Sequence, residues 1–197
     1  MSFFQNTCKP KGLGGSLMVN MMNIGHSPMA EWGLKHIKIN KNDISLDVGC
    51  GGGANIKKLL EKSPKGKVFG IDYSEVSVRK SKKVNKFAVE RKHCEILQGN
   101  VQELPFANET FDLATAFETI YFWSDIDQSF SQIYRVLKKG GIFMVCNESN
   151  GENDKDKKWT EIIKGMKIYT SKEIKYSLEK AGFTHIETNK NAKGWLC

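Results

Sequence analysis

The stretch ISLDVGCGGGA, residues 44–54, decides the fold of this chain. Residues 44–48 predict a buried strand, and the glycines after it let the backbone turn sharply and let a ligand approach the main chain closely. Residues 54–62 then follow with helical spacing. Because the first N–H groups of a helix lack intrahelical partners, they favour polar or anionic ligands. The stretch therefore predicts a strand, a tight turn and a helix, with a ligand site at the turn.

The same alternation continues along the chain. Further strands are expected at 68–71, 95–98, 111–117 and 141–146, with helices at 74–90 and 127–137. Near the C-terminus we expect a helix at 171–181, a strand at 183–188 and the first residues of one more strand at 194–197. This rhythm predicts an α/β fold, Rossmann-like and doubly wound, with a mostly parallel seven-stranded sheet, a short or truncated last strand and helices on both faces. Ligands of such sheets bind at the carboxyl ends of the strands.

The chain of 197 residues has the length of one domain and shows no internal repeat or low-complexity linker. We expect an N-terminal helical extension or lid over 1–40, followed by one α/β domain over 41–197. No apolar run approaches the roughly 18 residues that span a bilayer, and Lys and Gly interrupt the N-terminus before a signal-peptide core forms. The expected location is the cytoplasm, without a membrane partner.

Charge and cysteine usage exclude some classes of function. The net charge of +8 comes mostly from scattered lysines, with arginine only at Arg79, Arg91 and Arg135. Because arginine is the residue suited to bidentate phosphate contacts, this distribution favours a solvated surface, although it leaves a nucleic-acid partner open. The five cysteines are widely spaced and include no C-x-x-C pair, which argues against a disulfide framework and a zinc site. We expect no metal.

Two acidic residues narrow the choice of ligand for the glycine turn. Gly49, Gly51 and Ala54 also satisfy the dinucleotide fingerprint, so the glycines alone do not choose between cofactors. Asp72, at the end of the second expected strand, is placed to bond ribose hydroxyls in a nicotinamide or an adenosylmethionine enzyme. Asp47 favours the second, because a carboxylate beside the turn repels a pyrophosphate and tolerates an ammonium and a sulfonium.

Three further motifs follow in order: QGNVQELPF at 98–106, FDL at 111–113 and RVLKKGG at 135–141. With the glycine turn, this set resembles the class I S-adenosylmethionine-dependent methyltransferases of the type 11 group, over roughly residues 40 to 147. The resemblance implies a methyltransferase domain over 41–197 that uses S-adenosylmethionine, releases S-adenosylhomocysteine and transfers the methyl group by in-line displacement. Lys139 and Asn100 depart from the pattern, since the family often has Pro and usually Asp there.

The resemblance also implies which residues hold the cofactor. Glycines pass under its methionine and ribose, Asp72 binds the ribose, Asn100 accepts from the adenine amino group, and a Phe117 carbonyl meets the ammonium. The full expected set is Asp47, Gly49, Gly51, Gly53, Asp72, Tyr73, Asn100, Val101 and Phe117.

The methyl acceptor is expected above the strand ends, under the N-terminal extension. The stretch FETIY at 117–121 lacks the Asn/Asp-Pro-Pro-Tyr type of motif used by amino-directed nucleic-acid and protein methyltransferases, which favours a small-molecule acceptor. No catalytic base stands out, and the candidates are His26, Glu118 and Tyr121. Further candidates for the pocket or for a methionine-rich lid are Trp32, Trp123, Glu148, Met18, Met21, Met22 and Met29.

Three alternatives stay open at this point. An RNA or protein methyltransferase would use the positive charge, and a non-catalytic binding module would keep the cofactor site with a filled acceptor pocket. A nicotinamide oxidoreductase is disfavoured, because no catalytic Tyr/Lys pair or phosphate-binding Arg is recognisable. The acceptor atom and the oligomeric state are not determined by the sequence.

Overall fold

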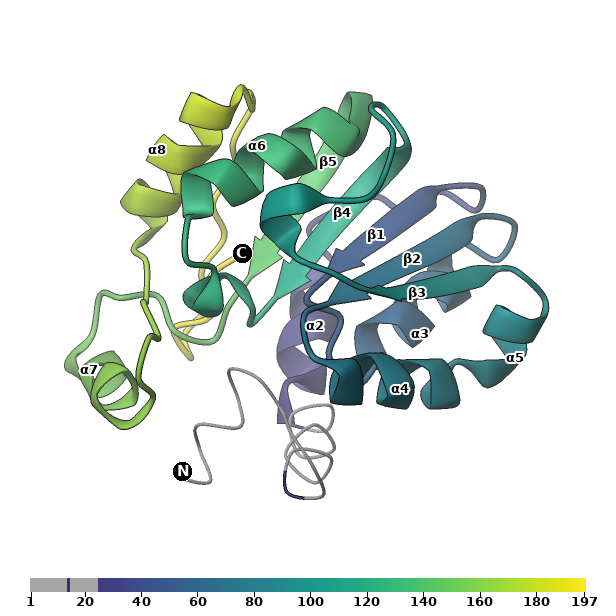
Figure 1. The fold of residues 1–197 in the computed structure, drawn as a ribbon. Coiled ribbons are helices and arrows are strands. Elements are labelled where there is room, and N and C mark those ends of the chain that lie inside the picture. Colours follow the sequence, from purple (N-terminus) through teal and green to yellow (C-terminus); the bar gives the residue numbers. More distant parts are fainter. Residues whose placement is uncertain (1–13, 15–24) are drawn as a thin grey trace.

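A computed structural model describes residue 14 and residues 25–197, and its centre is a five-stranded sheet (Figure 1). The strands are β1 (Ile44–Val48), β2 (Lys67–Asp72), β3 (Cys94–Gln98), β4 (Phe111–Phe117) and β5 (Leu137–Cys146). Their order is β3-β2-β1-β4-β5, and all four neighbouring pairs are parallel. β2 and β3 are added on one side of β1, whereas β4 and β5 are added on its other side, so the strand order reverses between β1 and β4. Such sheets open a crevice for ligands at this point.

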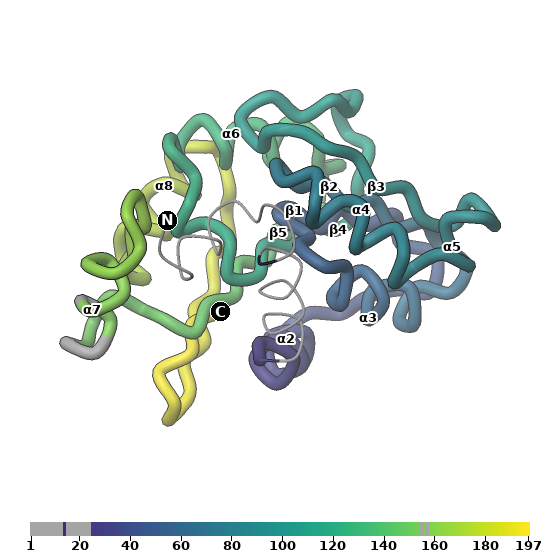
Figure 2. Tube along the Cα trace, turned by 60° about the horizontal axis from the view of Figure 1, so that its bottom comes forward, coloured from purple at the N-terminus to yellow at the C-terminus, as the bar shows by residue number. Residues whose placement is uncertain are grey.

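Helices cover both faces of this sheet (Figures 1 and 2). On one face lie α2, α3 and α4, and on the other lie α6 and α8. The helices, including short 3-10 turns, are α2 (Ser27–Gly33), α3 (Ala54–Lys62), α4 (Glu75–Val84), α5 (Lys86–Glu90), η2 (Val101–Glu103), η3 (Ile120–Phe122), α6 (Ile126–Val136), α7 (Asp154–Ile162) and α8 (Ser171–Ala181). The expected α/β architecture with helices on both faces is confirmed.

The strands are apolar on both faces because both faces are covered. In β4, Leu113 and Phe117 pack into the core under α2 and α3, whereas Ala114 and Ala116 pack into the core under α6 and α8. Successive side chains of a strand point to opposite faces, so β2, β4 and β5 each contribute to two separate cores. This fixes the register of the central strands and therefore the height at which their ends meet the crevice.

The expected helix over 74–90 is interrupted at Asn85, which separates α4 from α5. The Asn85 amide donates to the carbonyls of Gly53 and Ser81, each at 3.0 Å. A buried asparagine that bonds the backbone competes with helical hydrogen bonding, which accounts for the break. The same side chain fastens α4 to the glycine turn.

The prediction of seven strands is wrong, since the described residues form five. Residues 183–188 do not form the expected strand: His185 has φ 54°, a left-handed conformation that interrupts an extended chain. Near the end, Leu196 makes only isolated antiparallel bridges, to Asn147 and to Lys190. Conversely, β5 begins at Leu137, four residues before its expected start, so the Lys-Lys-Gly-Gly segment belongs to the strand.

The expected extension over 1–40 is described only in part, and Met18, Met21 and Met22 lie outside the described residues. Within the described part, Met29, Ala30 and Leu34 are buried in the core against α3 and β5. Trp32 packs on His36 and Trp195, away from the crevice. Among the helices of the described residues, none has the length and apolarity required to cross a membrane.

Candidate active site

The three turn glycines have left-handed backbones, with φ of 73° at Gly49, 51° at Gly51 and 82° at Gly53. A side chain at Gly49 would overlap Thr119, and one at Gly53 would overlap Ser81. Gly51 instead has no atom within 4 Å of the position of a Cβ. Two of the glycines are therefore needed for close packing, whereas Gly51 faces open space.

Asp72 ties the glycine turn to the end of β2. One carboxylate oxygen accepts from the Gly51 N–H at 2.8 Å and the other accepts from the Ser74 N–H at 2.8 Å. Burial raises the pKa of Asp72, although these hydrogen bonds oppose the shift. Each oxygen keeps a second lone pair, so the carboxylate can still accept from a ligand hydroxyl.

Asp47 is buried at the end of β1 with one oxygen unpaired among the described residues. Its other oxygen accepts from the Thr115 hydroxyl at 2.8 Å. Burial raises the pKa of Asp47 to about 7. Since a buried unpaired carboxylate oxygen is costly, a cationic or hydrogen-bonding group nearby would stabilise this site.

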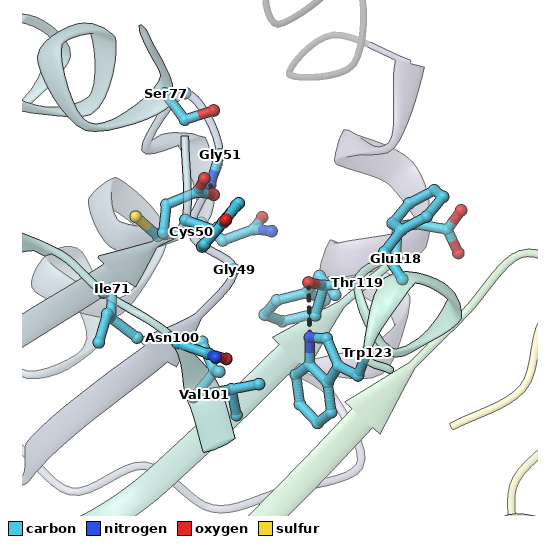
Figure 3. Close-up of a pocket in the computed structure, with 18 of the residues that line it drawn as sticks. Gly49, Cys50, Gly51, Ile71, Ser77, Asn100, Val101, Glu118, Thr119 and Trp123 are labelled. Atoms are coloured by element: carbon cyan, nitrogen blue, oxygen red, sulfur yellow. Dashed lines mark hydrogen bonds between the residues drawn. The ribbon is translucent and has the colours of Figure 1, made fainter. Parts of the chain in front are cut away.

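A cavity of about 350 Å³ opens at the carboxyl ends of the strands, a size typical of small-molecule sites. Figure 3 shows Gly49, Cys50 and Gly51 on one wall and Glu118, Thr119 and Trp123 on the facing wall. Of the expected cofactor residues, the cavity is lined by Gly49, Gly51, Asp72, Tyr73, Asn100, Val101 and Phe117. Asp47 and Gly53 do not line it.

Asn100 and Val101 form the start of η2 at the cavity. The Asn100 side-chain oxygen accepts from the Gln102 N–H at 3.1 Å and so caps η2. Val101 is the first residue of this turn, where a backbone N–H has no intrahelical acceptor. Tyr73 is 58% exposed beside them. This edge offers a carbonyl acceptor, a backbone donor and an aromatic ring.

Three ionisable side chains from distant segments meet at the other end. His26, just before α2, has its Nδ1 atom 3.2 Å from Glu148 Oε1 and 3.8 Å from Glu118 Oε2. Glu118 follows β4 and Glu148 follows β5, and Glu118 has a left-handed backbone with φ 57°. His26 and Glu118 line the cavity. The structure therefore brings together two of the three expected catalytic candidates.

Tyr121, the third candidate, is buried behind Glu118 and does not line the cavity. Its hydroxyl lies 3.0 Å from Glu118 Oε1 and accepts from the Ser149 N–H at 3.0 Å. The Glu148 N–H donates to the same Glu118 oxygen. Tyr121 therefore holds the Glu118 carboxylate in place and does not border the cavity.

The pKa values of Glu118 and His26 in this cluster are shifted from their ordinary values. Burial raises the pKa of Glu118 to about 7, although His26 opposes the shift. For His26, burial lowers the pKa, but the contacts with Glu148 and Glu118 outweigh burial and leave the pKa raised. Groups with pKa values near neutrality in a cleft are suited to proton transfer.

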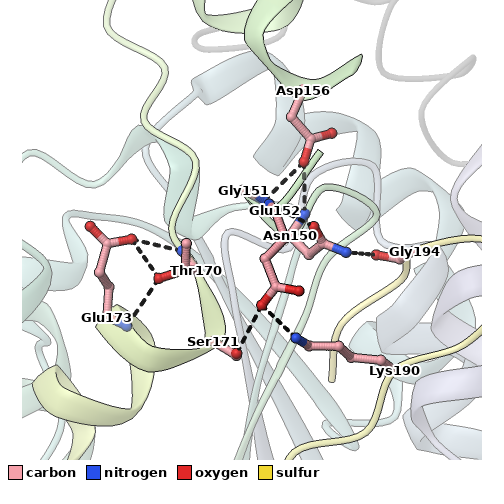
Figure 4. Close-up of polar contacts among 9 residues, drawn as sticks. All are labelled: Asn150, Gly151, Glu152, Asp156, Thr170, Ser171, Glu173, Lys190 and Gly194. Carbon is pink, nitrogen blue, oxygen red and sulfur yellow. Dashed lines mark hydrogen bonds and ion pairs between the residues drawn. The ribbon is translucent and has the colours of Figure 1, made fainter. Parts of the chain in front are cut away.

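The loop that carries Glu148 is anchored by a polar network (Figure 4). Asp156 accepts from the N–H groups of Asn150 and Gly151, at 3.1 and 2.9 Å. The Asn150 amide donates to the Gly194 carbonyl at 2.8 Å. The C-terminal residues thus help to position the loop that carries Glu148, a role that no sequence signal indicated; the same is true of Thr115 and Asn85 near the glycine turn.

Comparison with known proteins identifies the family. A family model described as "Methyltransferase domain" matches residues 46–145. The 24-methylenesterol C-methyltransferase 3 of Arabidopsis thaliana is 29% identical over 80% of this chain and 46% of its own length. A demethylmenaquinone methyltransferase of Alkalihalophilus pseudofirmus is 35% identical over 59% of this chain and 49% of its own. The chain thus spans about half the length of these relatives.

Solved structures agree on the fold. A putative methyltransferase of Haloferax volcanii, in complex with the Trm112 methyltransferase activator, superposes with a TM-score of 0.82 at 24% identity, covering 89% of this chain and 76% of its own. A SAM-dependent methyltransferase of Aquifex aeolicus gives 0.76 at 23% identity, covering 92% and 95%. The open space at Gly51 and the unpaired Asp47 oxygen fit the family's cofactor. The chain belongs to the class I S-adenosylmethionine-dependent methyltransferases, and S-adenosylmethionine is its cofactor.

Proposed function

We propose that this protein transfers a methyl group from S-adenosylmethionine to a small-molecule acceptor at the carboxyl ends of the strands. One observation carries the proposal: a single cavity joins the glycine turn and Asp72 to His26 and Glu118. The names of the relatives support a small acceptor, since one acts on a methylenesterol and another on demethylmenaquinone. An RNA or protein acceptor has no comparable support.

The adenosine half of the donor would lie between Asp72 and η2. Asp72 would accept from the ribose hydroxyls through charge-assisted hydrogen bonds. The Asn100 side-chain oxygen and the Val101 N–H would bond the adenine edge, beside the exposed ring of Tyr73. Gly51 leaves the room that the ribose needs.

The methionine half would lie along β1 and β4. The Phe117 carbonyl would accept from the ammonium group, and the buried negative charge of Asp47 would attract it directly or through water. Binding of this cation would lower the pKa of Asp47 toward its ordinary range. Gly49 and Gly53 would contribute by holding the turn in place.

The bound sulfonium supplies an activated methyl group, so the chain has to align the acceptor and exclude water. Trp123 and Phe117 form an apolar part of the wall, and Trp123 is held by its Nε1 hydrogen bond to Thr119 at 3.3 Å. His26 borders the acceptor end, and most of the expected 1–40 extension before it lies outside the described residues.

Calorimetry with S-adenosylhomocysteine and with NAD tests the donor site. We expect binding of the first and none of the second. Asp72→Ala should weaken S-adenosylhomocysteine binding by about 1–3 kcal/mol through lost charge-assisted hydrogen bonds. Asp127→Ala, which removes an exposed carboxylate paired with Lys180, is the matched control and should bind normally. Normal binding by a folded Asp72→Ala protein would refute the ribose assignment.

A further inference from the structure

We propose that Glu118 is the proton acceptor of the methyl transfer and that Tyr121 is its positioning residue. The acceptor is then a molecule whose methylated atom carries a hydrogen. This inference rests on the proposed function and deepens it, because it excludes acceptors without such a hydrogen, such as tertiary amines and thioethers.

The two oxygens of Glu118 have different surroundings. Oε1 is held by the Tyr121 hydroxyl at 3.0 Å and by the Glu148 N–H, which come from η3 and from the loop after β5. Oε2 has no such donor and lies 3.8 Å from His26 Nδ1. Hydrogen bonds to one oxygen fix the orientation of the carboxylate, and the second oxygen stays available to a proton.

A purely structural role does not account for this arrangement. Glu118 is a buried carboxylate with a left-handed backbone, and both features cost free energy. Burial also raises its pKa to about 7, which suits a base that works near neutral pH. Such strained, desolvated groups are found where a protein uses their reactivity.

A path for the proton leads outward from Glu118. The exposed fraction of the side chain rises from 14% in Glu118 to 30% in His26 and 35% in Glu148. His26 lies between the two carboxylates, and its raised pKa favours proton binding. A proton taken up by Glu118 thus has an imidazole and then a partly exposed carboxylate within a few ångströms.

An electron pair of the acceptor atom forms the new bond to the methyl carbon, and the carbon–sulfur bond breaks with its electrons moving to sulfur. The sulfonium becomes the neutral thioether of S-adenosylhomocysteine. The hydrogen on the methylated atom leaves as a proton to Glu118 Oε2. The protonated His26 gives its Nδ1 proton to Glu148, from which it reaches water, and the freed Nδ1 atom then takes the proton from Glu118.

Sinefungin tests this placement without a known acceptor. It is a donor analogue that carries a primary amine where the sulfonium carries its methyl group. If the Glu118 carboxylate faces that position, Glu118→Gln should weaken sinefungin binding at least about tenfold in calorimetry. Binding of S-adenosylhomocysteine should change less than about twofold. Glu95→Gln, an exposed carboxylate paired with Lys67, is the control and should change neither affinity.

The pH dependence gives a second readout. The preference for sinefungin over S-adenosylhomocysteine should grow from pH 6 to pH 8 as Glu118 ionises, and should stay flat in Glu118→Gln. The ionisable groups that face Glu118 are His26, Glu148, Tyr121 and Cys146. Tyr121→Phe removes a hydrogen bond to the carboxylate, so it should shift the midpoint of this pH dependence upward without abolishing the preference.

The outcomes separate the two proposals. Failure of the wild-type protein to bind S-adenosylhomocysteine overturns the proposed function. If the wild-type protein binds S-adenosylhomocysteine, two results for Glu118→Gln overturn only the role of Glu118. In one, the affinities for sinefungin and S-adenosylhomocysteine fall equally, and in the other the affinity for sinefungin does not fall. A gain in sinefungin affinity that requires added Mg²⁺ or Zn²⁺ and disappears with EDTA would also overturn it, since the cluster would then hold a metal.

Discussion

The two ends of the cavity are built in different ways. The donor end consists mostly of backbone: left-handed glycines, strand ends and the N–H groups of Gly51 and Ser74, all held by Asp72. The acceptor end consists of side chains that come from before α2, after β4 and after β5. The first depends on backbone geometry within one strand–turn–helix unit and its neighbour, and the second depends on contacts between three segments that are distant in the sequence.

This difference has consequences for substitution. At the donor end, a change in backbone freedom should be more severe than a side-chain change that keeps the hydrogen-bonding oxygen in place. At the acceptor end, side-chain chemistry should matter most. The following predictions use the donor end to test this contrast.

The largest effect is expected at Gly49. Gly49→Ala imposes left-handed strain and also drives a side chain into Thr119, which lies on the facing wall of the cavity. We expect donor affinity to fall about 100-fold or more and the free energy of unfolding to fall by more than the roughly 1–2 kcal/mol of strain alone. Urea unfolding and calorimetry with S-adenosylhomocysteine measure both.

Gly140→Ala is the matched control for Gly49→Ala. Gly140 also has a left-handed backbone, with φ 77°, but a side chain there meets nothing within 4 Å. We expect the loss of stability from strain and no loss of donor affinity. Equal effects of the two substitutions would contradict the role given to the Thr119 contact.

An intermediate effect concerns Asp47 and pH. Its folded-state pKa of about 7 lies above the ordinary value of 3.8, so the folded protein favours the protonated form. This contribution to stability is full below pH 4 and is lost as pH rises through 7, with a slope of up to about 1.4 kcal/mol per pH unit. Asp47→Asn should flatten the fall in stability between pH 5 and pH 7 in urea unfolding without donor.

Asp112→Asn is the comparison for that experiment. Burial favours a higher pKa for Asp112, but Lys138 and the Ile44 N–H outweigh it and the pKa is lowered. Its ionisation is therefore complete below pH 5, and its replacement should leave the slope between pH 5 and pH 7 unchanged. A steep slope that persists in Asp47→Asn would show that another group with a raised pKa accounts for it, namely Asp72, Glu118 or His26.

The smallest effect is expected at Asn100. Asn100→Asp keeps the oxygen that caps η2 and that would accept from adenine. Donor affinity should therefore change less than about threefold. A tenfold change in either direction, measured with S-adenosylhomocysteine, would show that the charge of this residue matters and not only its acceptor oxygen.

Where the sequence interpretation failed, tertiary contacts outweighed local pattern. The apolar residues at 183 and 186 resemble a strand, but His185 between them has a left-handed backbone and the segment makes no ladder with β5. The helix over 74–90 has good helical spacing, yet Asn85 leaves it to bond the Gly53 carbonyl. In both places a single residue made a contact or adopted a conformation that periodicity does not reveal.

The amino-acid sequence was sufficient to predict the parallel α/β sheet, the glycine turn at 49–53 and the family. These features follow from residues that are neighbours in the chain, because glycine freedom and strand burial are local properties. Three features required the folded structure: the meeting of His26, Glu118 and Glu148, the support of Glu118 by Tyr121, and the formation of five strands. Those depend on the burial of charge and on contacts across the fold, which arise only when distant segments pack together.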